Sequence, residues 1–456
     1  MLNPLYIYGI KKYMRSSCPE TLLYIDTEAR DAFLQRIPLL AQSFIYKDPP
    51  PSFRDTALEV FKCFFQNSIP ESDLCTLIAK AFPFKVPVFP IDPRTYILDL
   101  THGNGGFCTD FGAQMTAQLV NYFYQQSGLP LHILFAGESF ELLSLAQAFS
   151  QLSGIHSTFL YPRDCAHNSI EQLLCTQPEH IHVFKIDGTL ADCQTLVQTI
   201  AEDTDVNRAL ELFIPDTAQI GYLLSYTCCC IYAALAVHAR TGYDNTIEKP
   251  RLIIGTPMRI SGTLSAAVAA QQMNTPISGF LTTVESPSLS SKVTYPKEYA
   301  LLNMLYQGRS TNISSFGADI AVYQFNQQKR LDALRSCNDR TGYLISPAAA
   351  EVWYAWNEIK NGRKEGENNQ LEAAEIAGFA IDHLPLWITD RNAAQSCISI
   401  IMEPSHPCFY MDVVKAATGR EPSIPHRFEY NLQVPQEPAR MNASVDDLKD
   451  WLFSLL

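Results

Sequence analysis

Charged residues are scarce in this chain and are never gathered into a run. Only 18% of the 456 residues are charged, and the formal net charge of −13 at pH 7 is spread along the sequence. No basic stripe with interleaved aromatic residues is present, which argues against nucleic acid and against an anionic membrane as partners. The composition, 47% apolar, is that of an ordinary globular protein and predicts two or three domains around a large core.

A membrane-spanning run and a secretory signal are also missing. The longest apolar stretch, Cys228–Val237, stops well short of the length that crosses a bilayer. Residues 1–12 place their charges after the apolar residues and have no continuous apolar core. We therefore expect a cytoplasmic protein.

No cysteines have the spacing of a metal or redox site. The chain has 13 cysteines, an odd number, and none lies in a Cys-x-x-Cys pair or in a His/Cys array with zinc-ligand spacing. The run Cys228–Cys230 cannot bind one ion, because consecutive side chains on a helix point in different directions. We expect reduced, mostly buried thiols and no metal.

The pattern of apolar residues predicts an α/β protein. Residues 1–92 form a predicted helical N-terminal region, because apolar residues recur at helical spacing over 55–65 and 70–82. Short apolar strands then alternate with helices over a first α/β domain, 93–245, and a second, 246–456, which includes a proline-rich tail. Such alternation predicts parallel sheets covered by helices on both faces.

Individual elements follow from the same pattern. A polar, glycine-containing stretch over 360–369 predicts a surface loop. We expect strands over 96–100, 132–136, 157–161, 181–186, 251–255 and 280–284, and helices over 110–126, 140–152, 262–273 and 445–456.

The segment Leu98–Ala113 carries the most informative motif. It reads LDLTHGNGGFCTDFGA and resembles the segment of threonine synthases, roughly Leu-Glu-Leu-Phe-His-Gly-Pro-Thr-x-Ala-Phe-Lys-Asp-Phe-Gly-Ala, that carries their cofactor lysine. In that family the lysine holds pyridoxal phosphate as a Schiff base. Thr109 stands at its position here, and a hydroxyl cannot form an imine with an aldehyde. The resemblance therefore implies a threonine synthase scaffold without its covalent anchor.

Other segments resemble the same family in the same order along the chain, over 69–74, 160–163, 186–188, 192–194, 342–347 and 405–409. The resemblance implies a threonine synthase-like fold, of the fold type II pyridoxal-phosphate class that is also called tryptophan synthase β-like. It has two open parallel-sheet α/β halves.

Four further cofactor contacts of the family also differ here. The family's Ser-Gly-Asp-Thr-Gly turn corresponds to Glu138–Leu142, and its glycine-rich phosphate loop lies opposite Gly255–Ser261, where Pro257 removes a backbone N–H. The family's Ala-Thr-Asn is Thr283–Glu285, and the threonine that meets the pyridine nitrogen corresponds to Pro404. From these differences we expect no cofactor.

No lysine is an obvious replacement for the missing one. Lys185 falls on a predicted strand in another part of the sheet, and Lys292 and Lys297 fall in a loop-like stretch.

Three candidates for a residual pocket lie around the motif. His102 is a pocket residue or a hydrogen-bonded histidine at a strand end. Asp110 is a pocket residue or a cap of the helix that follows. Thr109 is a candidate nucleophile only with an adjacent base, which the sequence does not supply.

Two further candidates lie outside the motif. Glu138 lies one helical turn from Glu141, so both carboxylates face the same way. The two form either a pair for acid/base chemistry or metal binding, or a capping pair at a helix start. Arg259 is an anion-binding residue or a salt-bridged one.

Three functional hypotheses remain. The first is a catalytically inactive threonine synthase homologue, a pseudoenzyme with a binding or regulatory role, acting as a monomer or homodimer toward a protein partner or a small anionic ligand. The second is a threonine synthase-type lyase that converts O-phosphohomoserine to threonine and phosphate. The third is that the cleft has been repurposed for another small ligand. A cleft filled by apolar side chains such as Phe140 and Met258 would contradict this hypothesis.

Overall fold

The structure is a computed structural model. It describes residues 37–65, 68–127, 131–164, 168–216, 219–241, 250–285, 301–302, 305–306, 319–361, 375–376, 379–380, 387, 396–433 and 437–456.

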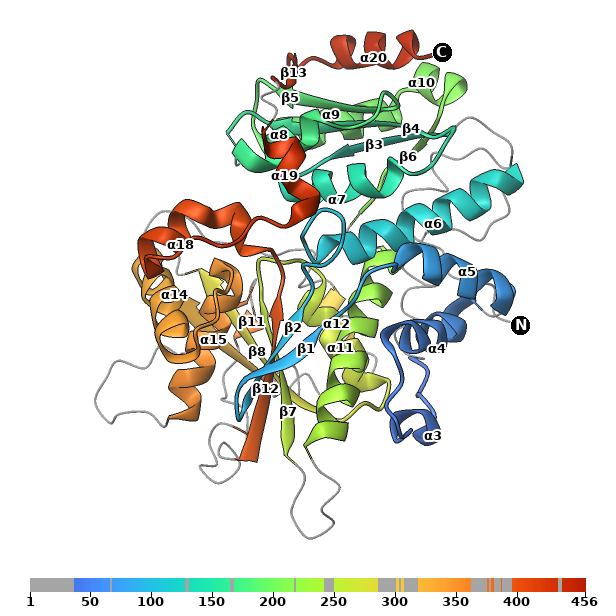
Figure 1. Ribbon diagram of the computed structural model, residues 1–456. Coiled ribbons are helices and arrows are strands. Elements are labelled where there is room, and N and C mark those ends of the chain that lie inside the picture. Colours follow the sequence, from blue (N-terminus) through green and yellow to red (C-terminus); the bar gives the residue numbers. More distant parts are fainter. Residues whose placement is uncertain are drawn as a thin grey trace.

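The larger of two main sheets has six strands, in the order β1-β2-β12-β7-β8-β9 (Figure 1, lower half). Strands β1 and β2 pair antiparallel, and every other neighbouring pair is parallel. The strands are β1 Val88–Asp92, β2 Thr95–Asp99, β7 Arg251–Pro257, β8 Ile277–Glu285, β9 Ile320–Phe325 and β12 Cys397–Glu403.

The smaller sheet has five parallel strands in the order β13-β5-β4-β3-β6 and occupies the upper part of Figure 1. These are β3 Leu131–Ala136, β4 His156–Pro162, β5 Ile181–Ile186, β6 Glu211–Phe213 and β13 Ala439–Met441. A separate two-stranded ribbon pairs β10 Glu375–Ile376 with β11 Phe379–Ala380.

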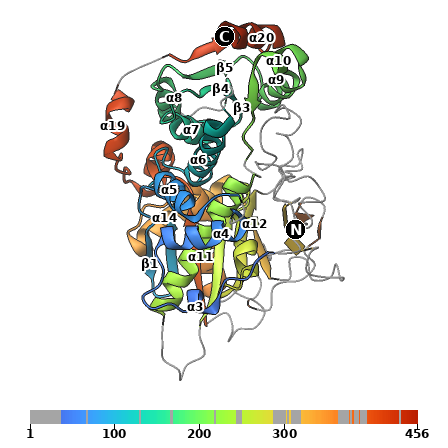
Figure 2. The same ribbon diagram turned by 90° about the vertical axis from the view of Figure 1, so that its right-hand side faces the viewer.

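Helices connect the strands and cover the sheets (Figure 2). They are α3 Gln42–Ile45, α4 Phe53–Phe65, α5 Glu71–Ala81, α6 Thr109–Ser127, α7 Ser139–Phe149, α8 Asn168–Cys175, α9 Leu190–Glu202, α10 Thr204–Ala209, α11 Ile220–Arg240, α12 Thr263–Gln272, α14 Gln327–Thr341, α15 Pro347–Lys360, η2 Pro407–Tyr410, α18 Met411–Thr418, α19 His426–Gln433 and α20 Val445–Ser454.

Both faces of the larger sheet are apolar, which is why its strands read as continuous hydrophobic runs. Leu252 and Ile254 of β7 point into one core with α11 and α12, whereas Ile253 points into the other with α14 and α15. Because successive side chains of a strand alternate between faces, a strand buried on both sides needs apolar residues at nearly every position. The predicted α/β class with helices on both faces is confirmed.

Each sheet contains strands from both predicted α/β segments. Strand β2 lies within 93–245 but pairs with β12 of the larger sheet, whereas β13 lies within 246–456 but pairs with β5 of the smaller one. Helix α20 follows β13 and packs against the smaller sheet through Leu448 and Leu452. The chain therefore crosses between the two sheets more than once, which local patterns cannot show.

The apolar stretch around Cys228 belongs to a longer helix than the sequence pattern indicated. Helix α11 has 21 residues and is long and apolar enough to cross a membrane, by length and composition alone. However, 94% of its apolar window is buried inside the fold, so it is placed as a core helix. Residues Cys228–Cys230 are fully buried, and every cysteine in the described part of the chain is free, as expected.

Candidate functional site

Thr109 begins α6 at the base of the loop that carries the motif, and only 3% of its surface is exposed. Its Oγ1 lies 2.7 Å from Oγ of Ser144 on α7, and Ser144 in turn donates to Oδ1 of Asp110 at 2.6 Å. A serine hydroxyl has a single proton, so a Ser144 that donates to Asp110 accepts from Thr109. The start of α6 thus carries a buried hydrogen-bond chain from Thr109 through Ser144 to Asp110.

Asp110 holds the loop that precedes α6. Its Oδ2 accepts from the backbone N–H groups of Gly105, Gly106 and Phe107 at 3.0, 2.8 and 3.1 Å. Burial raises its pKa to about 6, although the hydrogen bond from Ser144 acts in the opposite direction. We predicted a cap of the following helix. The carboxylate instead accepts from the preceding loop, because Asp110 itself lies in the first turn of α6. At that place the helix dipole also favours its negative charge.

Aromatic rings pack closely around this loop. Gly106 has φ +82° and its Cα lies so near Phe409 that a Cβ there would come within 2.9 Å of the ring. Phe107 stacks on Phe409 with ring centroids 4.6 Å apart and also lies 5.8 Å from Phe140. A glycine is therefore required at 106 by both conformation and space.

His102 lies at the end of β2 and is partnered. Its Nε2 is 3.1 Å from Oδ2 of Asp99, and 43% of its side chain is exposed. Burial acts to raise the pKa of Asp99, but the hydrogen bonds from His102 and Thr101 outweigh it and hold that pKa below its usual value. This geometry is that of a hydrogen-bonded histidine at a strand end.

Glu138 and Glu141 meet at the start of α7. The backbone N–H of Glu138 donates to Oε2 of Glu141 at 3.0 Å, and the Glu138 side chain receives the N3 backbone N–H in a capping box. Both carboxylates are thus used to satisfy the helix N-terminus. This arrangement corresponds to the capping alternative for the pair.

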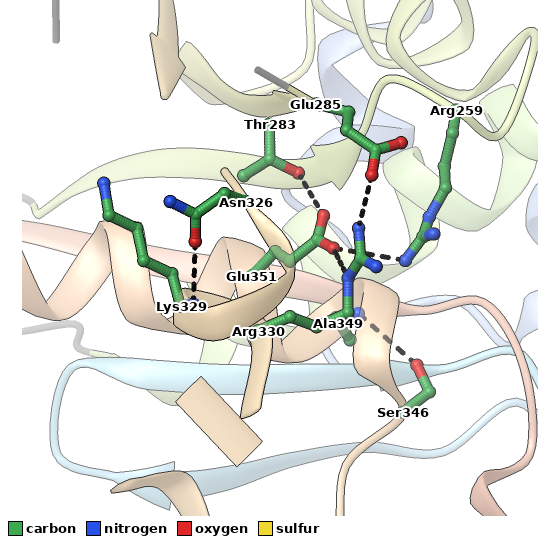
Figure 3. A network of polar contacts seen from close by, with 9 residues as sticks. All are labelled: Arg259, Thr283, Glu285, Asn326, Lys329, Arg330, Ser346, Ala349 and Glu351. Carbon is green, nitrogen blue, oxygen red and sulfur yellow. Dashed lines mark hydrogen bonds and ion pairs between the residues drawn. The ribbon is translucent and has the colours of Figure 1, made fainter. Parts of the chain in front are cut away.

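Arg259 belongs to a second polar cluster, which we call the Glu351 network (Figure 3). Glu351 on α15 is buried, with 5% of its side chain exposed, and it pairs with Arg330 on α14 and with Arg259, whose Nη2 is 3.3 Å away. Thr283 on β8 donates to Glu351 at 3.3 Å, and Arg330 also pairs with Glu285 at 3.5 Å. Arg259 and Glu351 therefore tie the β7–α12 loop to helices that follow β9.

Glu403 ends the central strand β12 as a fully buried carboxyl group. Its two oxygens accept from the backbone N–H of Ser346 at 3.3 and 3.1 Å, at the N-terminus of α15. Burial raises its pKa to about 8, and the hydrogen bond from Ser346 offsets only part of that effect. The carboxyl end of the larger sheet therefore holds a group that is largely protonated near neutral pH.

The structure brings only some of the predicted residues together. Thr109 and Asp110 share Ser144, whereas Arg259 lies in the Glu351 network and has no hydrogen bond or ion pair to them. Sequence reasoning missed Ser144, Glu351 and Glu403. Glu351 and Glu403 are single acidic residues in otherwise apolar segments, PAAAEVW and CISIIME, and that isolation is a signal that could have identified them.

Of the three lysines considered as replacements, only Lys185 lies in the described part of the chain, and it is paired elsewhere. Lys185 on β5 pairs with Glu171 at 2.7 Å in the smaller sheet. Lys292 and Lys297 lie outside the described residues, as does the greater part of the predicted loop over 360–369.

Known proteins similar to this chain are threonine synthases, although no protein-family model matches it. The threonine synthase of Serratia marcescens is 22% identical over 417 residues, which cover 87% of this chain and 86% of that protein. The threonine synthase structure from Escherichia coli has a TM-score of 0.72 at 19% identity and covers 94% of this chain and 96% of its own. The pyridoxal-phosphate-bound threonine synthase from Brucella melitensis has a TM-score of 0.71 at 17% identity and covers 93% and 96%.

These likenesses confirm the fold and the resemblance seen in the sequence. The two-sheet architecture is that of the fold type II pyridoxal-phosphate class. Within that class, the chain is similar to threonine synthases, one of which it matches over 87% of its length at 22% identity.

The prediction that the chain has no cofactor is contradicted by the comparisons. The Brucella melitensis threonine synthase was solved with pyridoxal phosphate bound, and the fold it shares with this chain points to that group. The differences at Pro257, Pro404 and the lysine position therefore do not establish that the cofactor is lost.

The residues present fit one end of pyridoxal phosphate and not the other. The ten-residue helix α12 begins after Gly262, whose φ is +86°, and the buried Oγ of the neighbouring Ser261 has no hydrogen-bond partner in the described part of the chain. A helix N-terminus beside an unpartnered hydroxyl suits a phosphate group. At the other end, the hydroxyl of Thr109 cannot make the covalent link that an amine makes.

Proposed function

We propose that this protein is a threonine synthase-like pseudoenzyme with a binding or regulatory role. The observation that carries the proposal is Thr109 at the position of the family lysine, buried and hydrogen-bonded to Ser144. Pyridoxal phosphate supplies an electron sink for amino-acid chemistry when an enzyme binds it. Without an amine at this position, Thr109 itself can neither hold the aldehyde as an imine nor move protons there as the family lysine does.

The hydrogen-bond chain around Thr109 also argues against a substitute nucleophile. The Thr109 proton is donated to Ser144 and the Ser144 proton to Asp110, so Thr109 has a hydroxyl rather than a base directly beside it and reaches the Asp110 carboxylate only through Ser144. Asp110 is committed to three backbone N–H groups as well. A threonine nucleophile needs a base that can take its proton, and Asp110 is already satisfied without doing so.

A repurposed cleft receives little support near the motif. Met258 is 1% exposed, and Phe140 packs beside Phe107 with ring centroids 5.8 Å apart. Met258 is thus buried and Phe140 is half-buried, so neither offers a polar group to a new pocket.

The threonine synthase-type lyase is the second candidate, and one observation favours it. The N-terminus of α12 with Ser261 suits a phosphate group, which both pyridoxal phosphate and O-phosphohomoserine carry. On this alternative the cofactor would be held without a link to Thr109.

A phosphate-release assay separates the two candidates. Purified full-length protein is incubated with O-phosphohomoserine and an excess of pyridoxal phosphate, and the threonine synthase of Escherichia coli serves as the active control. We expect no phosphate above a protein-free blank. Release that scales with protein concentration and yields an equal amount of threonine would restore the lyase hypothesis.

A cytoplasmic location and a monomeric or homodimeric state remain predictions, which cell fractionation and light scattering can test.

A further inference from the structure

A cavity of about 610 Å³ lies at the outer edge of the smaller sheet, away from the motif and from the Glu351 network. Ile186 and Met441, at the carboxyl ends of β5 and β13, form part of its wall, and α20 provides another part. In Figure 1 these elements lie at the top of the molecule, on the side of the smaller sheet that faces away from the larger one. Ligands of open α/β sheets bind outside the carboxyl ends of the strands.

Most charged groups around this cavity already have partners. Arg163 pairs with Asp187. Lys185 pairs with Glu171 at 2.7 Å, and Asp447 accepts from the side-chain amide of Asn442 at 2.8 Å. These groups line the cavity, but each already has a partner within the protein and does not need a charged ligand.

Two cavity-lining groups of opposite charge differ from the others, because their side chains are unpaired within the described part of the chain. Arg440 on β13 and Asp450 on α20 both line the cavity and are exposed, and neither side chain has a hydrogen bond or an ion pair to any residue that the structure describes. An unpaired guanidinium binds a carboxylate well, because its planar N–H groups match the two oxygens. An unpaired carboxylate in the same cavity suits an ammonium group.

Trp451 supplies an apolar surface to the cavity and packs on the smaller sheet. Its Nε1 lies 3.3 Å from Oγ1 of Thr158, and its ring packs edge-to-face on His182 and Phe184, with centroids 4.9 and 5.0 Å away. With its orientation held on these sides, the indole loses little freedom when a ligand packs on it.

We propose that this cavity binds a free amino acid. Arg440 receives the carboxylate, Asp450 receives the ammonium group, and the ligand side chain packs toward Trp451. The volume lies within the range of small-molecule sites. The proposal goes beyond the function argued above and does not depend on it, because no residue of this cavity belongs to the motif or to the Glu351 network.

The test is isothermal titration of the full chain with each of the twenty protein amino acids, followed by variants against the tightest ligand. We expect Arg440→Gln and Asp450→Asn each to weaken binding by about tenfold or more, because each removes one charge-assisted contact. Asp446→Asn changes an exposed residue of the same helix that does not line the cavity, and it should leave the dissociation constant unchanged.

Other outcomes overturn the proposal. If no amino acid binds at millimolar concentration, the cavity is not an amino-acid site. The same conclusion follows if binding is equally tight in Arg440→Gln, or if acetate alone binds as well as the amino acid does. Circular dichroism of each variant shows whether the fold is intact, and both target residues are exposed, so we expect unchanged spectra.

Discussion

A single residue, Glu403, makes the stability of the protein depend on pH at the carboxyl end of the larger sheet. Glu403 is fully buried at the end of β12, and burial raises its pKa to about 8, against 4.5 for a free glutamate. The protonated carboxyl therefore contributes stability that is fully present below about pH 4.5 and is lost as the pH rises through about 8. This sign is opposite to that of a salt-bridged carboxylate.

The variant Glu403→Gln tests this residue-scale claim. Glutamine keeps an oxygen for the N–H of Ser346 and cannot ionise, so its free energy of unfolding should rise relative to the native chain between pH 5 and pH 9, by roughly a few kcal/mol. Urea unfolding at a series of pH values measures the difference. The exposed Glu358→Gln is the matched control and should give a flat difference. Parallel curves for Glu403→Gln and the native chain would show that the carboxyl is ionised throughout.

The sequence predicts the part of the site whose residues are neighbours in the chain, and not the part that comes from another helix. Thr109 and Asp110 are adjacent in a recognisable motif, so their importance is visible without a structure. Ser144, which joins them, comes from a different helix, 35 residues after Thr109. A hydroxyl within the apolar run Leu142–Ala146 carries no local signal of a partner, because its partner is fixed by how α7 packs on α6.

At the scale of elements, the Glu351 network joins pieces that are far apart in the chain. Arg259 and Glu351 are separated by 92 positions, and Arg330 reaches both Glu351 and Glu285. Removing one partner of a buried ion pair leaves the other charge uncompensated, which costs more than the pair itself contributes. The network therefore fixes how α14 and α15 sit on the sheet edge near the β7–α12 loop.

Neutralising Glu351 should destabilise the protein much more than neutralising a neighbour on the same helix. We expect Glu351→Gln to lower the free energy of unfolding by about 3 kcal/mol, because Arg330 then keeps only Glu285. Glu358→Gln, an exposed site on α15, should change it by less than about 0.5 kcal/mol. Chemical denaturation of the two variants gives both values. Equal effects would mean that the network contributes nothing beyond a surface ion pair.

Elements with clear periodicity are predicted well by the sequence, whereas continuous apolar runs are predicted in some cases, such as 251–255 in β7, and missed in others. The predicted helix over 110–126 and the strand over 181–186 match α6 and β5 closely. Strand β12, fully buried in the middle of the larger sheet, was not predicted, because a short apolar run without alternation fits a buried helix as well as a strand. Its neighbours β2 and β7 are set by pairing across long sequence separations.

At the scale of the whole molecule, the last described segment completes the smaller sheet rather than extending the larger one. Leu448 and Leu452 of α20 are fully buried in a core with Leu160 and Ile186. The two sheets are therefore each built from chain segments on both sides of the predicted boundary at 245. That arrangement makes the stability of the smaller sheet depend on α20.

Leu448→Ala tests that dependence. Truncating a fully buried leucine costs about 2–5 kcal/mol through lost burial and the cavity left behind. Leu456→Ala is the matched control, since that side chain is 68% exposed, and it should have no measurable effect. Thermal unfolding should show a lower midpoint for Leu448→Ala alone. Identical midpoints would indicate that α20 is not part of the folded core.

We propose that Thr109 of this threonine synthase-like chain stands where the family carries its cofactor lysine. The most direct measurement incubates the full chain with the cofactor, reduces with borohydride and maps pyridoxylated lysines by peptide mass spectrometry. We expect only scattered, substoichiometric labelling of surface lysines and none at position 109. Stoichiometric labelling of one lysine would contradict it, because that lysine would be the anchor the motif lacks and the chain would again be a candidate threonine synthase.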